Sequence, residues 1–324
     1  MVKFAKTGAE ANSIAIRLAR SSTKKNNIPV CGYHGWHDWY LSANLQKKSN
    51  LDNHLLQGLN VSGVPKKLTG TTYTFNYNDI NGLKKLIKEK NIGIIKMEVI
   101  RNQIPKDNFL NKVRILANKF NIILIFDECT SGFRETFGGI HLKYKVNPDI
   151  AVFGKALGNG YPITAVLGIN DIMKNYSKTF ISSTFWSDRV GFVAAIETLK
   201  IMEKKKSWIK ITNLGKYIKN KWLILSKKNK VNIKITGIPS LLNFDIISKD
   251  SEKYMTYLSY LMLKNSILAS SAFYISILHN KKNLKKYFNV MDNFFNIVFK
   301  CETGKKNIDD LMQTSVRSSK FQRL

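Results

Sequence analysis

Two apolar stretches of the sequence, IILIFDE (residues 122–128) and DIAVFGK (residues 149–155), each end in residues that carry charge. Similar apolar runs, IGIIKMEVI (residues 92–100) and ITAVLGI (residues 163–169), stand on either side of them. We predict a strand in each run, because all four are short and nearly continuous in apolar residues. Strands of this composition are buried on both faces, as in a parallel sheet that helices cover.

Amphipathic segments separate or flank these runs and predict helices. The segments span residues 11–20, 80–90 and 109–120, and a longer helix is expected to begin near Val190. Their apolar residues recur at the spacing that gathers them on one face of a helix. The alternation of helices with buried strands predicts an α/β fold, in which helices sandwich a mostly parallel sheet.

The pattern weakens after residue 205, where lysine-rich helical segments surround a short predicted strand at SLLNFDII (residues 240–247). This change predicts a boundary between two domains. We expect a large domain over residues 1–205, a smaller C-terminal α/β domain over residues 206–301, and a polar tail over residues 302–324.

The chain is strongly basic, with 52 Lys and Arg residues against 22 Asp and Glu residues and a net charge of +30. Only eight of the basic residues are arginine, and the lysines are scattered in doublets such as Lys24-Lys25. A nucleic-acid-binding face more often gathers arginine and aromatic residues on one surface. We therefore read most of this charge as solvated surface and expect no nucleic-acid partner.

Other features of the composition bear on location. No apolar run reaches about 18 residues, so we expect neither a membrane-spanning helix nor a membrane partner. The N-terminus lacks the layout of a secretory signal. The three cysteines, Cys31, Cys129 and Cys301, form no CxxC motif and suggest no disulfide framework. These features predict a cytoplasmic protein.

The most informative single residue is Lys155, which follows an apolar run and precedes a glycine-rich segment. The segment is not a P-loop, because Ala156 stands where Ser or Thr is required. It does not match GxGxxG either, because Ile163 occupies the position of the third glycine. Phosphate-loop readings of Lys155 are therefore excluded.

Asp127 offers Lys155 a partner. Both residues come at the ends of predicted strands, and in open α/β sheets ligands collect at the carboxyl ends of strands. A buried carboxylate there must be paired to stay ionised. An amine and a carboxylate at one sheet edge suit pyridoxal 5′-phosphate: the lysine forms a Schiff base with it, and the aspartate holds its ring nitrogen protonated. A plain Asp-Lys ion pair would explain the same placement.

Two further segments fit that cofactor. KTGAEAN (residues 6–12) is a turn of small residues that opens into a helix, where backbone N–H groups bind phosphate. YHGWHDWY (residues 33–40) gathers aromatic residues, and Tyr33 can stack on a flat ring. His34 and His37 lack metal-ligand spacing and a Cys/His cluster, so we expect no metal site.

Taken together, these stretches resemble the class III (fold type I) pyridoxal-phosphate aminotransferases, in particular the branch typified by glutamate-1-semialdehyde 2,1-aminomutase. The resemblance covers residues 2 to about 205 and is weaker beyond them. The segments that carry it are VKFAKTGAEANSIAIRLAR, YHGWHD, TFNYNDI, MEVIRNQIPKDNFL, IFDECTSGFRETFGG and NPDIAVFGKALGNGYPITAVLG.

The resemblance implies a role for each matching residue around the cofactor. Lys155 matches the Schiff-base lysine, and Asp127 matches the partner of the pyridine nitrogen. Gly8 and Ala9 match the phosphate-binding turn, and Tyr33 matches the residue stacked on the ring.

Three more residues are implicated by the resemblance. Glu98 matches a glutamate at a strand end near the cofactor, and His34 is expected behind the residues that touch it. Thr184 matches a threonine that reaches the cofactor phosphate of the neighbouring subunit, which implies a homodimer.

The resemblance implies an enzyme that transfers an amino group from a small-molecule donor to an acceptor, as a transaminase or an aminomutase. FWSDR (residues 185–189) replaces the SGNP of the aminomutase type and favours an aminotransferase of surface-sugar pathways. Family members carry a further segment before KTGAEAN, so the chain from Met1 is expected to be N-terminally truncated. A cofactor-binding remnant with impaired catalysis is the alternative.

Overall fold

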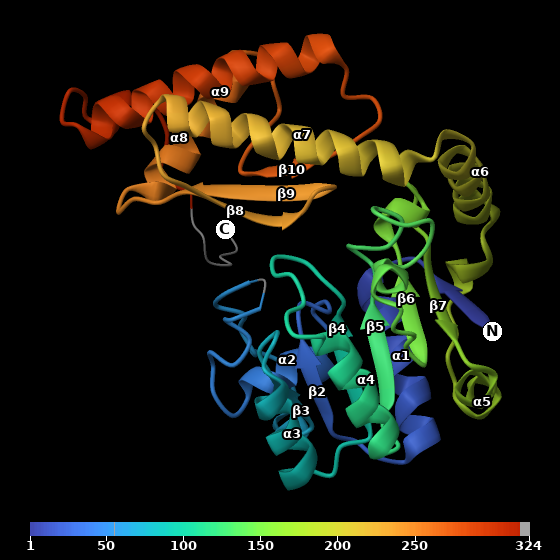
Figure 1. Cartoon of the computed structure of the whole chain (residues 1–324). Coiled ribbons are helices and arrows are strands. Elements are labelled where there is room, and N and C mark those ends of the chain that lie inside the picture. The colour runs from blue at the N-terminus through green and yellow to red at the C-terminus, as the bar shows by residue number, and fades with distance from the viewer. Residues whose placement is uncertain (55, 318–324) are drawn as a thin grey trace. The chain divides into compact units, whose positions relative to one another are not determined.

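The computed structural model describes residues 1–54 and 56–317 and divides the chain into two compact units. The first unit spans Met1–Lys205, and the second begins at Lys206. Both units contain helices and strands, as Figure 1 shows. No helix in the described ranges combines the length and the apolar character needed to cross a bilayer.

Seven strands of the first unit form one sheet in the order β1-β7-β6-β5-β4-β2-β3. Neighbouring strands from β3 to β6 pair in parallel, whereas β7 is antiparallel to both β6 and β1. The predicted, mostly parallel sheet is therefore confirmed. The strands are β1 (Val2–Ala5), β2 (Ile28–Cys31), β3 (Thr72–Thr74), β4 (Ile94–Glu98), β5 (Ile123–Asp127), β6 (Ile150–Phe153) and β7 (Thr164–Gly168).

The predicted helices of this unit are present with small changes at their ends, and α2 and α5 are additional single turns. The helices are α1 (Gly8–Thr23), α2 (Asp38–Leu41), α3 (Ile80–Glu89), α4 (Phe109–Lys119), α5 (Asn170–Met173) and α6 (Arg189–Lys205). Helix α1 begins at Gly8, within the turn that was expected to open into a helix, and a capping box fixes this start. The Glu10 N–H donates to Thr7 Oγ1, and Glu10 Oε2 accepts from the Thr7 N–H at 2.7 Å.

The core of the first unit lies between α1 and one face of the sheet. Small residues on α1, including Ala11 and Ala15, belong to the same buried cluster as Ile94, Ile125 and Val152 of the central strands. Alanine side chains let the helix axis approach the sheet closely. The first turn of α1 is thereby held beside the carboxyl ends of β5 and β6.

The second unit consists of a three-stranded antiparallel sheet and four helices within the described residues. Its elements are α7 (Ser207–Lys228), β8 (Ile233–Ile238), β9 (Leu241–Ile246), α8 (Ser251–Lys264), β10 (Ala272–Tyr274), α9 (Lys281–Glu302) and α10 (Ile308–Leu311). Trp222 of α7 is fully buried against Phe244, and its Nε1–H donates to the Tyr287 hydroxyl at 3.0 Å.

The polar segment after residue 301 contacts the second unit in its described part. Ile308 is buried in the core of that unit, and Arg317 Nε donates to the Glu252 carboxylate at 2.7 Å. The rest of the expected tail, residues 318–324, lies outside the described residues.

Candidate active site

Lys155 and Asp127 lie at the carboxyl edge of the sheet, on neighbouring strands. Asp127 is the last residue of β5, and Lys155 follows the last residue of β6 by two positions. The strands pair in parallel with Asp127 opposite Val152. Lys155 has a positive φ of 45°, which is uncommon for a residue other than glycine and recurs at functional sites.

The Lys155 amine is held by a hydroxyl group. Lys155 Nζ donates to Thr130 Oγ1 at 2.8 Å, and Arg101 Nη2 donates to the same oxygen at 2.9 Å. Burial and, next, the Arg101 cation lower the pKa of the Lys155 amine, against opposing contributions from Cys129, Glu98 and Asp127. A lowered pKa increases the fraction of neutral amine, which is the nucleophilic form.

Asp127 is buried, with 3% of its surface exposed, and both of its carboxylate oxygens are bonded. Oδ2 accepts from Asn12 Nδ2 at 2.8 Å and lies 2.8 Å from His34 Nδ1, and Oδ1 accepts from the Cys129 N–H at 3.0 Å. Burial alone would raise the pKa of this carboxyl. The Lys96 ammonium, His34 and the hydrogen bond from the Cys129 N–H outweigh burial and hold the pKa of Asp127 below its ordinary value, so Asp127 is ionised at neutral pH.

His34 contacts the buried Asp127 carboxylate through its ring nitrogen Nδ1. Burial lowers the pKa of the His34 imidazole, so the ring is neutral at neutral pH and its Nδ1–H donates to Asp127. Asn12 Nδ2 donates to the His34 carbonyl oxygen as well, at 3.2 Å. The same two side chains therefore fix the position of the Asp127 carboxylate.

The first turn of α1 lies beside both strand ends. A Cβ atom added to Gly8 would lie 3.4 Å from Cys129 Sγ, and one added to Gly154 would lie at the same distance from that sulfur. The N–H groups of the first turn, at Gly8 and Ala9, have no partners within the helix and carry its positive dipole end. The turn is therefore a suitable phosphate cradle close to Asp127 and Lys155.

Gly35 lets the aromatic loop approach that turn. Its φ is +109°, and a Cβ atom there would lie 2.8 Å from Ala9 Cβ. Two residues earlier, the Tyr33 N–H donates to Glu98 Oε2 at 3.1 Å, which ties the loop to the end of β4. The Tyr33 ring is partly buried and meets the Tyr40 ring edge-on at 6.0 Å.

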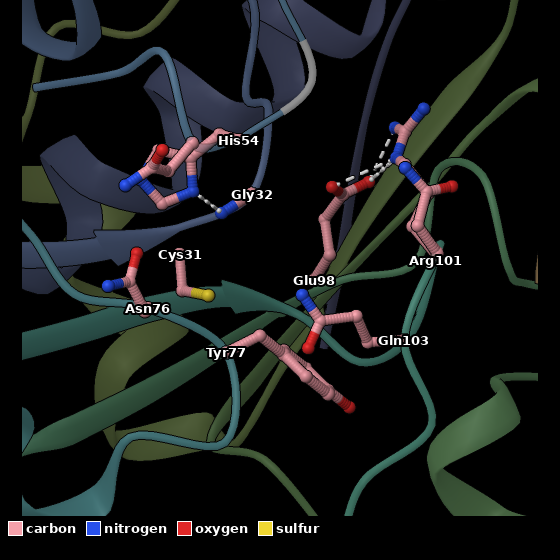
Figure 2. Close-up of a pocket in the computed structure, with 10 residues that line it drawn as sticks. Cys31, Gly32, His54, Asn76, Tyr77, Glu98, Arg101 and Gln103 are labelled. Carbon is pink, nitrogen blue, oxygen red and sulfur yellow. Dashed lines mark hydrogen bonds and ion pairs between the residues drawn. The ribbon is translucent and has the colours of Figure 1, made fainter. Parts of the chain in front are cut away.

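Glu98 forms an ion pair beside this loop. Its carboxylate accepts from Arg101 Nε at 2.9 and 3.0 Å, and Figure 2 shows the two side chains facing each other. They line a cavity of about 360 Å³ at the ends of β2 and β4, together with His54, Tyr77 and Gln103 among others. Since Arg101 also contacts Thr130, the cavity is linked to Lys155.

Thr184 lies in a segment that contacts β1, and Asp188 of this segment forms an ion pair with Lys6. Thr184 begins a short 3-10 turn, Thr184–Ser187, just before α6, and its side chain is exposed. It is not part of the hydrogen-bond network around Lys155 and Asp127 described above. The structure thus brings together Lys155, Asp127, the first turn of α1, Tyr33 and Glu98, but not Thr184.

Sequence reasoning missed three residues of this network: Asn12, Thr130 and Arg101. Asn12 carried a weak signal, because it lies on the buried face of α1, one turn after Gly8. Thr130 and Arg101 carried none, since their contacts with Lys155 and with each other join three loops that are distant in sequence.

The family model for class-III aminotransferases matches residues 1–270 of this chain. The chain belongs to the class-III aminotransferases. Among curated relatives, it is 36% identical over 248 residues to a 3-aminobutyryl-CoA aminotransferase of Cloacimonas acidaminovorans, covering 74% of this chain and 56% of the relative. It is 31% identical over 327 residues to a glutamate-1-semialdehyde 2,1-aminomutase of Wigglesworthia glossinidia brevipalpis, covering 92% and 74%. The chain thus spans between about half and three quarters of these relatives.

Solved structures share the fold of this chain. The FumI protein of Sphingopyxis sp. MTA144, in its PLP internal aldimine form, matches with a TM-score of 0.82 at 22% identity, covering 96% of this chain and 74% of FumI. An omega-transaminase from Sphaerobacter thermophilus matches with a TM-score of 0.78 at 21% identity, covering 91% and 74%. The predicted fold type I is confirmed.

The residues at the sheet edge fit pyridoxal 5′-phosphate, the predicted cofactor. The amine of Lys155, with its lowered pKa, is available to the aldehyde of the cofactor. The ionised, buried carboxylate of Asp127 is available to the ring nitrogen, and the first turn of α1 is available to the phosphate.

Proposed function

We propose that this chain is a pyridoxal 5′-phosphate-dependent enzyme that moves an amino group, as a transaminase or a 2,1-aminomutase. One observation carries the proposal: an amine of lowered pKa, Lys155, lies at the same sheet edge as a carboxylate that is held ionised, Asp127. A surface ion pair would need neither the buried Asn12–His34 support of Asp127 nor the Thr130 hydroxyl at Lys155.

The cofactor, when bound, supplies an aldehyde that bonds to an amine and a ring that accepts electrons. Lys155 Nζ is the group proposed to bond to it and, once displaced by a substrate amine, to accept and return the proton of the substrate carbon. Asp127 would hold a proton on the ring nitrogen. Thr130 Oγ1 would orient Lys155 Nζ between these steps.

The remaining predicted residues would position the cofactor. The N–H groups of Gly8 and Ala9 would bind its phosphate, and Tyr33 would cover its ring. Glu98 would act on the site through Arg101 and through the Tyr33 backbone, both of which it binds.

We further propose a homodimer in which Thr184 completes the phosphate site of the other subunit. The support is an apolar surface next to Thr184: Phe185, Val190, Val193 and Ile196 are each more than half exposed. Exposed apolar surface of this extent is typical of an interface. The three free cysteines support our proposal of a cytoplasmic location, where thiols stay reduced.

Absorbance of the purified chain with added pyridoxal 5′-phosphate tests the central proposal. We expect a near-visible band in the wild type and in the matched control Lys112→Ala, an exposed lysine of α4, and loss of that band in Lys155→Ala. The band in Lys155→Ala at wild-type strength would refute the role of Lys155.

Turnover then separates an active enzyme from a cofactor-binding remnant. Glutamate-1-semialdehyde, 3-aminobutyryl-CoA and a keto sugar with an amino donor are the probes suggested by the relatives and by the FWSDR segment. Conversion of any of them supports the proposed activity, whereas cofactor binding without conversion of a broader donor panel favours the remnant.

A further inference from the structure

Lys96 is a buried lysine in the middle of a central strand. It occupies the third position of β4, has none of its surface exposed, and its Nζ finds no hydrogen-bond partner among the described residues. Burying an ammonium costs far more free energy than burying an apolar side chain of similar size, unless a charge of opposite sign compensates it. The position therefore requires a compensating group.

The strand register places Asp127 on the same face of the sheet as Lys96. Side chains two positions apart on a strand share a face, so Lys96 lies on the same face of the sheet as Glu98. Glu98 is opposite Asp127 in the parallel pairing of β4 with β5, which puts all three on the face covered by α1. Burial is the largest influence on the Lys96 amine and lowers its pKa. Among the groups that oppose this lowering and favour the charged form, Asp127 comes first, followed by Cys129 and Glu98.

The other groups around Asp127 are poor candidates for its counter-ion. Burial lowers the pKa of His34 and raises the pKa of the Cys129 thiol, so both are neutral at neutral pH. The Arg101 guanidinium is already paired with Glu98, and Lys155 is partly exposed and donates to Thr130. Lys96 is the cation whose charge contributes most to keeping Asp127 ionised.

We propose that Lys96 is a positioning residue whose buried amine, kept in its charged form by Asp127, acts as the counter-ion of that carboxylate. Lys96 keeps Asp127 ionised before the cofactor arrives. When a protonated ring nitrogen pairs with Asp127, the Lys96 ammonium is a second positive charge near that nitrogen. The bound cofactor would therefore lose its protons more readily. The second half of this proposal rests on the proposed function, but the first half does not.

Thermal unfolding of the cofactor-free chain tests the first half. Lys96→Met keeps the length of the side chain but leaves the Asp127 carboxylate buried without its cation. We expect the Tm to fall by about 10 °C, the consequence of breaking a buried pair in a unit of this size. The matched control is Ile94→Met, which is equally buried on the same face of β4 and should change the Tm little.

A double variant makes the test specific to the pair. If Lys96 compensates Asp127, then Asp127→Asn should recover most of the Tm lost in Lys96→Met, because the position of Asp127 then carries no charge that needs a cation. A Lys96→Met chain as stable as wild type, or a double variant no more stable than Lys96→Met, would overturn the proposal. If Lys96→Met does not fold, a folded double variant supports the pairing, and an unfolded one refutes it.

The pH dependence of the absorbance of the bound cofactor tests the second half, because a purely structural role of Lys96 would leave it unchanged. We expect the apparent pKa in its pH-dependent absorbance to rise by about one unit in Lys96→Met, because a nearby like charge has been removed. His34, Glu98, Cys129 and Lys155 face the same region, and Ile94→Met leaves all of them in place. An unchanged or lowered pKa would overturn the second half. A chain that binds no cofactor would refute the proposed function and leave the unfolding test valid.

Discussion

Replacing the Thr130 hydroxyl with a methyl group tests whether this hydroxyl orients the Lys155 amine for reaction. Its Oγ1 accepts from Lys155 Nζ at 2.8 Å and from Arg101 Nη2 at 2.9 Å, which uses both lone pairs of the hydroxyl. Thr130→Val preserves the shape of this side chain, which is 3% exposed, and removes both acceptors. Thr130→Ser is the matched control, because it keeps the hydroxyl.

The two lost hydrogen bonds differ in their effect. Arg101 is mostly buried and keeps its bonds to Glu98, so the loss of one bond should lower the free energy of unfolding by about 1 kcal/mol. Lys155 is exposed enough for water to replace its bond, so we expect no further loss of stability from it. The Lys155 amine instead loses the group that orients it, so we expect the barrier to covalent attachment of the cofactor to rise. A rise of about 1.4 kcal/mol makes the reaction tenfold slower.

Two measurements check this reasoning. Chemical denaturation should show the small loss of stability in Thr130→Val, and stopped-flow absorbance should show covalent attachment of pyridoxal 5′-phosphate about tenfold slower than in wild type. Thr130→Ser should remain close to wild type in both. A Thr130→Val chain that attaches the cofactor at the wild-type rate would refute a positioning role for the hydroxyl, even if its stability were reduced.

Three further predictions concern stability and assembly. Because the pKa of Asp127 is lowered on folding, its contribution to stability is present above the ordinary carboxyl pKa and is lost as the pH falls below that value. In urea unfolding, the free energy of unfolding of Asp127→Asn should therefore fall less between neutral and acid pH than that of the wild type. Gly35→Ala should weaken both folding and cofactor affinity more than Gly160→Ala, which has the same φ of +109° but no atom within 4 Å of the added Cβ; equal effects in melting and binding assays would contradict the packing against Ala9. Val193→Asp on the exposed face of α6 should convert the proposed dimer to monomer in sedimentation experiments, and an unchanged mass would count against that interface.

Much of the first unit could be predicted from local sequence. The runs over residues 122–128 and 149–155 are apolar almost throughout, and such runs form strands wherever helices can cover them. Strands β1, β2 and β3 were not predicted, because they contain only four, four and three residues. A segment this short has too few side chains to show an alternation, and its pairing with a neighbouring strand decides its conformation.

The sequence by itself placed Asp127 and Lys155 at strand ends, because the end of an apolar run is visible locally. Three relations were decided by the tertiary structure: the shared hydroxyl of Thr130, the Asn12 and His34 support of Asp127, and the burial of Lys96 on the face of Asp127. Each of these relations joins residues far apart in the chain. Lys96 interrupts an apolar run, and an exposed lysine could interrupt the run in the same way, so the sequence does not show that Lys96 is buried. Strand order and register determine which buried charges meet, and those properties depend on the pairing of whole strands rather than on any one of them.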